Sequence, residues 1–478
     1  MSEPLERLLR PRSVAVFGAS ERLPDFVGTM GRLGFRGEIY PINPKYTELH
    51  GLKSYAGIES VPGPVDYAIF AIPAPAVPGA IDQCAKKGVK LAHIFSGRFG
   101  ETGRPGDAEL EKEVLRAAKA GGIRIMGPNC MGLYDPRLGI SWTDDFPKEP
   151  GPVGLAFQSS YAAHDLVIAG STRGVRFSKV IGYGNALDLN ECHFLEHLCE
   201  DPATKVILMY VEGVKDGKRF FSDISQASLA KPVILAKGGR GESGARAASS
   251  HTASLTGSIQ TWNAAIRQAG AIPAASFEEM IDLAVTFSFL DSLPGLRVGI
   301  VSAGGGTGVM AADQCEEEGL EVAPLSQQMR LAMKSREMGF WDWVGNPVDM
   351  SIMPGSVMPG DSLAGDVMQT MASYSDVDLI MPIIGELHQK SAQEDLTGEA
   401  YARRFGIGKM EGKPILAVVA EKGLDLAERD DPANRMMCEV RTKLAAARIP
   451  TYPTVVRAAR AAKAFVEYHS RAAARKSA

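Results

Sequence analysis

The sequence predicts an α/β fold made of parallel, doubly wound sheets. Short apolar runs rich in β-branched residues alternate with amphipathic stretches along the chain, and most of these runs end in small or turn-forming residues. This alternation is typical of right-handed βαβ units, which place parallel strands in one sheet. A length of 478 residues suggests about three domains. Polar and proline-bearing stretches interrupt the pattern near residues 135–152 and 293–295. We therefore expect domains at residues 1–135, 150–290 and 295–468.

The composition is that of an ordinary globular protein. Hydrophobic residues make up 45% and charged residues 23% of the chain. A net charge of −4 gives no reason to expect nucleic acid or an anionic membrane as a partner. The first residues lack the apolar core of a secretory signal, and no apolar run approaches the roughly 20 residues that span a bilayer. Six cysteines are too few for a disulfide scaffold. We expect a cytoplasmic protein that binds neither nucleic acid nor membranes.

Two cysteines and two histidines lie close together at Cys192, His193, His197 and Cys199. On a helix, at about 100° per residue, the cysteines fall on one side and the histidines roughly 100–140° away. Four ligands spread so widely cannot converge on one tetrahedral metal ion. We predict an ordinary amphipathic helix here, and no metal site.

Five apolar runs in the first domain are predicted to be strands. They are Ser13–Phe17, Glu38–Tyr40, Val65–Ile72, Val89–Phe95 and Ile123–Met126, with helices most clearly at Ala76–Lys87 and Glu109–Ala120. Ligands of doubly wound sheets bind beyond the carboxyl ends of the strands. The residues at those positions are therefore candidate ligand-binding residues: Gly18, Asn43, Pro73, Ser96 and Asn129.

The first strand-to-helix turn argues against NAD as the ligand. It lacks Gly-x-Gly-x-x-Gly, because Ala19 and Ser20 follow Gly18. Where an acidic residue would hold the ribose 2′-hydroxyl, the chain has Asn43 and Lys45. A lysine suits a ligand with an extra ribose phosphate, which is the 3′-phosphate in coenzyme A and the 2′-phosphate in NADP. These residues leave CoA and NADP open, and a solvated turn lysine is the alternative.

A stretch rich in glycine and alanine, from Lys237 to Ser258, follows the predicted strand Pro232–Ala236 and contains His251. We predict a mobile loop, because small residues let a backbone swing or approach a ligand closely. Hydroxyl groups and loop amides can hold phosphate oxygens, and an imidazole can act as a covalent nucleophile. The hypothesis is that His251 carries a phosphoryl group. The alternative is a surface loop with an isolated histidine.

Glu212 follows the predicted strand Lys205–Val211. Glu212 and His251 are therefore expected at the same edge of one sheet, which also holds predicted strands Gly154–Phe157 and Phe177–Ile181. A carboxylate bonded to one imidazole nitrogen fixes the tautomer and leaves the other nitrogen as the nucleophile. We predict that Glu212 orients His251.

The third domain repeats a strand, a small-residue turn and a helix. Arg297–Val301 leads to the turn Gly304–Gly308 and then to a helix, which echoes residues 154–163. Gly305 and Gly306 could bind phosphate at the start of this helix. No Gly-Lys-Ser/Thr follows, as it would in a Walker loop, and a structural role is the equal alternative. Further strands are predicted at Val377–Ile384 and Pro414–Ala420.

Several short motifs of the first domain, taken in order, resemble the CoA-binding domain of the NDP-forming acyl-CoA synthetases. This superfamily includes succinyl-CoA synthetase and ADP-forming acetyl-CoA synthetase. The motifs are Gly18-Ala19-Ser20, Pro41-Ile42-Asn43-Pro44-Lys45, Ile72-Pro73, Ser96-Gly97 and Gly127-Pro128-Asn129-Cys130-Met131-Gly132. The resemblance implies a Rossmann-like CoA-binding domain followed by two flavodoxin-like domains of the succinyl-CoA synthetase kind. It also adds to the candidate CoA-binding residues Ala19, Ser20, Pro41, Lys45, Ile72 and Gly97.

The later domains are similar to the same synthetases. Lys237–Gly257 resembles their phosphohistidine loop, and Tyr210–Val214 resembles the segment that supplies its glutamate partner. The resemblance therefore implies His251 and Glu212 as catalytic residues. Gln158-Ser159-Ser160 resembles the family's Ser-Gln-Ser-Gly phosphate turn, which implies phosphate contacts from Ser159 and Ser160. Two positions depart from the family pattern: Ser160 and Ala253 stand where glycine is usual.

The resemblance covers roughly residues 8–468 and implies the α subunit of an ADP-forming acyl-CoA synthetase. Such enzymes interconvert a carboxylic acid, CoA and ATP with acyl-CoA, ADP and phosphate, through an acyl phosphate and a phosphohistidine. A separate ATP-grasp β subunit that binds ATP, ADP and Mg²⁺ is implied, in a hetero-oligomer or a homodimer. One alternative is a non-catalytic CoA-binding or scaffold protein that has lost its ATP-grasp partner, and another is an NADP-dependent oxidoreductase. The sequence does not identify the acid.

Overall fold

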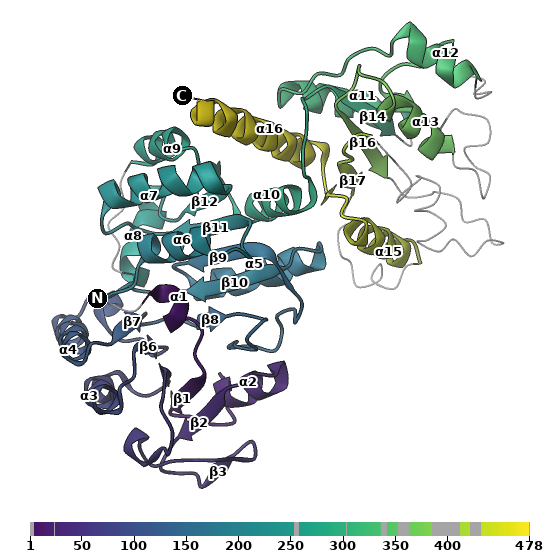
Figure 1. The fold of residues 1–478 in the computed structure, drawn as a ribbon. Helices are drawn as coiled ribbons and strands as arrows, with labels where there is room; N and C mark the ends of the chain where they lie inside the picture. Colours follow the sequence, from purple (N-terminus) through teal and green to yellow (C-terminus); the bar gives the residue numbers. More distant parts are fainter. Residues whose placement is uncertain are drawn as a thin grey trace. The chain divides into compact units, whose positions relative to one another are not determined.

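The computed structural model describes residues 4–22, 24–252, 258–302, 304–335, 342–351, 363–384, 412–420 and 432–477, without the side chains of 248–252, 363, 432–433 and 476–477. The chain forms two compact units (Figure 1). The first contains residues 1–171 and 175–280, and the second contains residues 172–174 and 281–478. Among the helices in the described ranges, none is both long and apolar enough to cross a membrane.

The first sheet is parallel, with strand order β2-β1-β5-β6-β7. The predicted doubly wound sheet is therefore confirmed, and β1 has the predicted bounds because its five residues are all buried. The strands are β1 (Ser13–Phe17), β2 (Glu38–Ile42), β5 (Tyr67–Phe70), β6 (Leu91–Ile94) and β7 (Arg124–Met126). The other elements are α1 (Leu5–Leu8), α2 (Phe26–Leu33), α3 (Val77–Lys87), α4 (Pro105–Gly121), the hairpin β3 (Glu48–Leu49) and β4 (Leu52–Lys53), and the 3₁₀ turns η1 (Ile58–Ser60), η2 (Ala74–Ala76) and η3 (Gly100–Thr102).

The second sheet has strand order β13-β12-β11-β9-β10-β8. Its parallel strands are β9 (Pro150–Phe157), β10 (Phe177–Gly182), β11 (Val206–Val211), β12 (Val233–Lys237) and β13 (Ile272–Ala274). The helices are α5 (Ser160–Thr172), α6 (Glu191–Glu200), α7 (Gly217–Ala230), α8 (Glu242–Thr252), α9 (Ile259–Gln268) and α10 (Phe277–Phe289). Strand β8 (Gly132–Tyr134) was not predicted. The chain leaves the first sheet after β7, and β8 then pairs antiparallel with β10 of the second sheet. This pairing fixes part of the segment that connects the two sheets.

Within the expected loop from Lys237 to Ser258, residues Glu242–Thr252 form helix α8, so the loop prediction was wrong for these residues. Helix α8 contains three alanines, Ala245, Ala247 and Ala248, and alanine has the highest intrinsic helix propensity. Glu242 in the first turn complements the positive end of the helix dipole. The described side chains of α8 are mostly exposed, which explains why no apolar periodicity announced the helix. Gly239, with φ +68°, makes the turn between β12 and α8.

The third sheet, in the second unit, is parallel with strand order β15-β14-β16-β17-β18. Counted along the chain, this is the order 2-1-3-4-5. The five parallel strands of the second sheet, β9 to β13, have the same order when the antiparallel β8 is left out, which confirms the predicted pair of flavodoxin-like folds. The strands are β14 (Val298–Ser302), β15 (Val348–Asp349), β16 (Leu379–Ile384), β17 (Ala417–Val419) and β18 (Thr451–Tyr452). The helices are α11 (Gly305–Glu317), α12 (Gln327–Ser335), α13 (Leu363–Ala372), α15 (Pro432–Ala446) and α16 (Val455–Ser477). The exact domain boundaries stay predictions.

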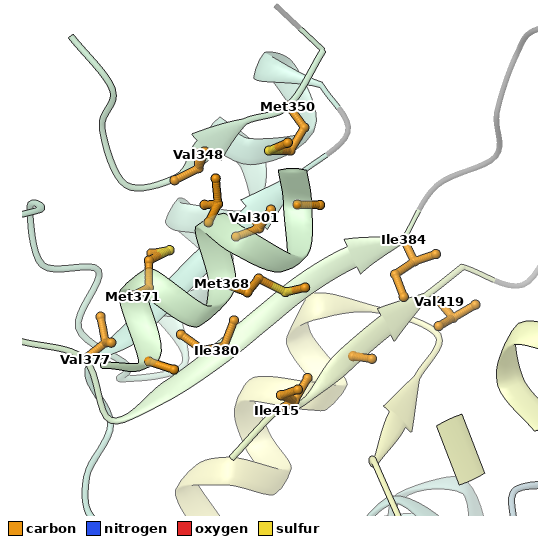
Figure 2. Close-up of a cluster of buried hydrophobic side chains, with 14 of the residues drawn as sticks. Val301, Val348, Met350, Met368, Met371, Val377, Ile380, Ile384, Ile415 and Val419 are labelled. Carbon is orange, nitrogen blue, oxygen red and sulfur yellow. The ribbon is translucent and has the colours of Figure 1, made fainter. Parts of the chain in front are cut away.

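One face of the third sheet carries a methionine-rich core. Figure 2 shows Met368 and Met371 of α13 beside Val301 of β14 and Ile380 of β16, and all four are buried. Asn346 fixes the neighbouring turn: its Nδ2 donates to Val298 O at 2.8 Å and to Ala323 O at 2.9 Å, and its Oδ1 accepts from Ile300 N at 2.9 Å. The segment Asn346–Asp349 is therefore anchored to this sheet by the Asn346 side chain.

A buried ion network joins the segment after β8 to the second sheet. Lys179 of β10 is fully buried, and its ammonium donates to Asp201 Oδ2 at 2.8 Å and lies 4.0 Å from Asp135. Arg137 pairs with Asp135 at 3.0 Å. Burial opposes ionisation of Asp201, but the hydrogen bond and charge of Lys179 lower its pKa to about 2. Removing either partner would leave an uncompensated buried charge, which typically costs about 3–5 kcal/mol.

His197 of α6 lies beside this network and makes stability depend on pH. Burial, and then the charge of Lys179, lower its pKa to about 3. In the unfolded chain His197 takes up a proton near pH 6.5, whereas in the folded chain it stays neutral until about pH 3. The contribution of His197 to the free energy of unfolding is therefore complete above pH 6.5 and is lost progressively as the pH falls toward 3. Between pH 7 and pH 5 we expect His197 to reduce the free energy of unfolding by about 2 kcal/mol, to be measured with urea at both pH values.

The variant His197→Gln should lose less stability over the same interval than the unchanged chain. A remaining loss is expected from His93, whose pKa burial lowers to about 4. Equal losses in the variant and in the unchanged chain would contradict the assignment to His197.

Candidate functional site

The turn after β1 lies where the first sheet reverses its winding, between β1 and β5. Gly18 has φ +76°, and a Cβ added to it would lie 2.2 Å from Ala71 O. Only glycine fits this turn, which brings the chain close to the end of β5. Ligands of doubly wound sheets bind at such a switch point. Ala19 is buried, while Ser20 is half-buried and its Oγ accepts from Arg22 N at 3.3 Å.

Asn43 links the turns after β1 and β2. Its Nδ2 donates to Ala19 O at 2.9 Å, and its Oδ1 accepts from Lys45 N at 3.0 Å. The amide group thus holds the shape of the turn, and Lys45 is exposed next to it. Pro41 is a buried residue within β2, so its place in the motif is structural.

The turns after β5, β6 and β7 meet in the same way. The Ser96 hydroxyl donates to the carbonyl groups of Ile72 and Phe70, and Ser96 O accepts from Asn129 N at 3.0 Å. A Cβ added to Gly97 would lie 3.1 Å from Asn129 Oδ1. Pro73 is exposed and Ile72 half-buried at this edge. The structure therefore brings the predicted strand-end residues together along one edge of the first sheet.

At the corresponding edge of the second sheet, Gln158 fixes the backbone of Glu212. Its Oε1 accepts from Glu212 N at 2.7 Å and from Gly213 N at 3.3 Å. Glu212 is only 3% exposed, although it lies beyond the end of β11. A carboxylate beyond the end of a strand is commonly exposed, but Glu212 is buried.

Tyr210 and Lys237 surround Glu212. Burial, then the charge of Glu212 and a hydrogen bond to it, raise the pKa of Tyr210, so the phenol stays protonated as a donor. The Lys237 ammonium donates to Glu212 O at 2.6 Å, and burial lowers the pKa of Lys237. A Cβ added to Gly238 would lie 2.4 Å from Tyr210 Oη and 3.1 Å from Glu212 Cγ. Gly238 therefore leaves the space that this arrangement needs.

Ser159 and Ser160 lie at the start of α5. Ser160 is its first residue and adopts helical backbone angles, so the strain that a positive φ would cause at this serine is absent. Its Oγ accepts from Met131 N at 2.9 Å, which commits the hydroxyl to the protein. Ser159 is half-buried immediately before the helix, where the dipole and amide groups favour an anion. Ser159 is the better phosphate candidate.

His251 belongs to the last turn of α8, but its side chain lies outside the described residues, so its contact with Glu212 stays a prediction. The helix lies beside η3 of the first domain. Gly305 and Gly306 begin α11 in the other unit, and a Cβ added to Gly305 would lie 2.8 Å from Asp349 Oδ2. A nearby carboxylate repels phosphate, which favours the structural role of Gly305.

Comparison with known proteins identifies the family. Residues 12–136 match the family described as the CoA binding domain, and residues 150–287 match the succinyl-CoA ligase like flavodoxin domain. The chain is 37% identical over 361 residues to the ADP-forming acetate–CoA ligase I subunit alpha of Pyrococcus furiosus, which covers 73% of this chain and 77% of that protein. This chain belongs to the family of ADP-forming acetate–CoA ligases.

The chain is also similar to two further proteins, one in sequence and one in structure. It is 38% identical over 352 residues to the ADP-forming acetate–CoA ligase I of Archaeoglobus fulgidus, covering 72% of this chain and 50% of that protein. The chain thus spans about half the length of that relative. It is also similar in structure to the dinucleotide forming acetyl-coenzyme A synthetase 1 of Ca. Korarchaeum cryptofilum, solved in complex with phosphate and ADP. The TM-score is 0.79 at 30% identity, over 98% of this chain and 97% of that one.

A hydrogen-bond network joins the CoA-binding domain to the ligase-like flavodoxin domain and was not predicted from the sequence. Asn185, after β10, donates through Nδ2 to Glu101 at 2.7 Å and to Glu111 at 3.2 Å. Glu101 in turn accepts from the backbone of Arg98 and Phe99 beside the Ser96 turn. The CoA-binding domain and the ligase-like flavodoxin domain are thus joined next to the candidate CoA edge. The position of Asn185 in the turn after β10 was the available signal.

The cysteine and histidine cluster forms part of helix α6. Cys192 and His197 are buried, and His193 Nδ1 lies 2.7 Å from Asn190 Oδ1 at the helix start. Within the described ranges, no group of three or more His, Cys, Asp or Glu residues is placed to hold a metal ion.

Two glycines of one turn offer a matched test of the Glu212 surroundings. Gly238→Ala should reduce the free energy of unfolding by about 1–3 kcal/mol, because the new methyl group overlaps the Tyr210 hydroxyl. Gly241→Ala should change it by less than about 0.5 kcal/mol, because nothing lies within 4 Å of a Cβ at that position. Urea unfolding of the two variants measures both values. Equal effects would contradict the close approach at Gly238.

Proposed function

We propose that this chain is the α subunit of an ADP-forming acyl-CoA synthetase. With its partner it would interconvert a carboxylic acid, CoA and ATP with acyl-CoA, ADP and phosphate. Family membership supports this proposal, as does the name of the Pyrococcus relative, an ADP-forming ligase subunit alpha. The observation that carries it is the buried Glu212, held by Gln158 at the sheet edge where β12 leads to the helix of His251.

CoA is proposed to bind along the carboxyl edge of the first sheet. Gly18 gives the close backbone approach that a bulky ligand needs, and Asn43 holds the next turn in place. The exposed Lys45 would bind the 3′-phosphate. CoA supplies the thiol that becomes acylated. Ser20, Pro73, Ser96, Gly97 and Asn129 would complete the edge.

His251 is the proposed phosphoryl carrier. Phosphate attacks the acyl-CoA thioester, the C–S bond breaks, and acyl phosphate and CoA result. An imidazole nitrogen of His251 then attacks the phosphorus, the bond to the acyl oxygen breaks, and the carboxylate leaves. Glu212 would hold the other nitrogen and stabilise the positive charge of the phosphohistidine, while Ser159 and the start of α5 bind the phosphate. The reverse sequence activates the acid.

An ATP-grasp β subunit is the proposed partner. It would bind ADP or ATP with Mg²⁺ and exchange the phosphoryl group with His251, in a hetero-oligomer located in the cytoplasm. The subunit name of the Pyrococcus relative is consistent with a separate partner chain.

Phosphoryl transfer is tested by incubating the chain with an ATP-grasp partner and ATP labelled with ³²P at the γ-phosphate. We expect an acid-labile, base-stable label on the chain, absent in His251→Ala and reduced at least tenfold in Glu212→Gln, which keeps the size but removes the charge. The matched control is Glu200→Gln at the exposed end of α6, which should label normally. A label that survives His251→Ala contradicts His251 as the carrier. Absence of the label from the unchanged chain favours a non-catalytic CoA-binding protein.

The CoA edge is tested by comparing CoA with dephospho-CoA. Lys45→Ala should weaken CoA binding about threefold to fivefold and leave dephospho-CoA unchanged, because an exposed charge pair contributes up to about 1 kcal/mol. Lys119→Ala, an exposed lysine in the last turn of α4 and hence at the opposite sheet edge, should affect neither. Isothermal titration calorimetry measures both ligands. Equal losses for the two ligands would remove the 3′-phosphate role, and binding of NADP but not CoA would overturn the CoA assignment.

A further inference from the structure

An apolar pocket of about 250 Å³ lies in the first unit between α7 and α9, beside the ends of β11 and β12. Neither the proposed CoA edge nor the proposed phosphoryl transfer uses it. Most of its wall is formed by aliphatic and aromatic side chains, among them Val214, Phe220, Phe221, Ile224, Trp262 and Ile266.

The deep wall of the pocket is part of the packed interior. Phe220 is 3% exposed, Ile224 is fully buried, and the rings of Phe220 and Trp262 stack at 6.0 Å with an interplanar angle of 25°. Side chains held in this way keep the pocket open without a ligand. A cavity of about 150 Å³ accepts benzene, so this pocket has room for a ring or a branched alkyl group with a short arm.

Lys237 is the charged residue of the pocket wall. Its Nζ donates to Glu212 O at 2.6 Å and to Gly238 O, and it lies 5.7 Å from the centroid of the Trp262 ring. These contacts hold the ammonium group at one place beside the apolar wall. Burial lowers the pKa of Lys237, which shows that the cation has lost hydration. An anionic group would compensate that loss, and a carboxylate accepts charge-assisted hydrogen bonds from an ammonium group.

We propose that this pocket binds an apolar monocarboxylate, with the ring or branched alkyl group between α7 and α9 and the carboxylate on Lys237. The apolar wall disfavours dicarboxylates, because a second charge would lose its hydration there. Acetate is too small to make use of the wall. Such a ligand is either the acid that the enzyme activates or an acid that regulates it. Only the first of these rests on the proposed function, and it would make an aryl or branched-chain acid the substrate class.

Calorimetry on the full chain tests the binding site directly, with phenylacetate as the probe. Phenylacetamide, which lacks the charge, and acetate, which lacks the ring, should each bind at least tenfold more weakly. Lys237→Met should weaken phenylacetate at least tenfold and leave phenylacetamide unchanged, which separates loss of the charge from a general disturbance of the pocket.

Two neighbouring alanines of α9 provide matched variants. Ala265 lines the pocket, so Ala265→Leu should fill it and weaken phenylacetate at least tenfold. Ala264 is exposed outside the lining, and Ala264→Leu should bind phenylacetate like the unchanged chain. Equal binding by both variants would overturn the site. The site would also be overturned if the unchanged chain bound none of the three acids phenylacetate, isovalerate and benzoate.

Assays with the ATP-grasp partner, ATP and CoA distinguish the two sources of the ligand. For a substrate, Ala265→Leu lowers kcat/KM for phenylacetate at least tenfold and leaves that for acetate unchanged. For a regulator, phenylacetate changes the rate with acetate without being consumed, and Ala265→Leu abolishes this effect. Calorimetric binding that persists while no acid releases ADP would remove the proposed function and leave the binding site standing.

Discussion

Parallel strands with the order 2-1-3-4-5 deliver all their carboxyl ends to one edge of a sheet, and the chain beyond each strand must find partners there. In the second sheet the side chain of Gln158 provides such a hydrogen-bond partner. Gln158 follows β9 and accepts hydrogen bonds from the two amides that follow β11, at 2.7 and 3.3 Å. A buried amide without an acceptor costs about 1–3 kcal/mol. The bond thus fixes where the chain leaves β11, and with it the position of Glu212.

At this edge Ser160 is accommodated by a glycine of the neighbouring strand. Ser160 is the first residue of α5, and its hydroxyl accepts from Met131 N. The neighbouring strand makes room for this serine, because a Cβ added to Gly182 would lie 2.3 Å from Ser160 Oγ. The bond to Met131 also ties the chain that leaves the first sheet to the start of α5. Ser160 therefore links the first two sheets, and its hydroxyl is committed to this link.

The sequence was sufficient where local pattern decides structure. The bounds of β1 could be predicted to the residue. Its five residues are all buried, and the strand ends at Gly18, whose positive φ marks a tight turn. The pattern failed for α8, because alanine and glycine together favour a helix and a loop almost equally when no apolar face is present. It also could not show the burial of Lys179, since that depends on Asp201, which is distant in sequence. Candidate residues at strand ends followed from topology, whereas the hydrogen bonds among Asn185, Glu101 and Glu111 needed the assembled domains.

The surroundings of Glu212 suit a carboxylate whose negative charge is needed by another group. Lys237 lies beside this carboxylate, and its ammonium group donates to the main-chain oxygens of Glu212 and Gly238, which are neutral acceptors. Tyr210 remains protonated beside the carboxylate because burial and the Glu212 charge raise its pKa. A neutral donor can orient a carboxylate without neutralising it, and in a site of low dielectric the charge then acts strongly on a nearby imidazolium. This arrangement explains why Gly238 lacks a side chain: a Cβ would displace the phenol that orients the carboxylate.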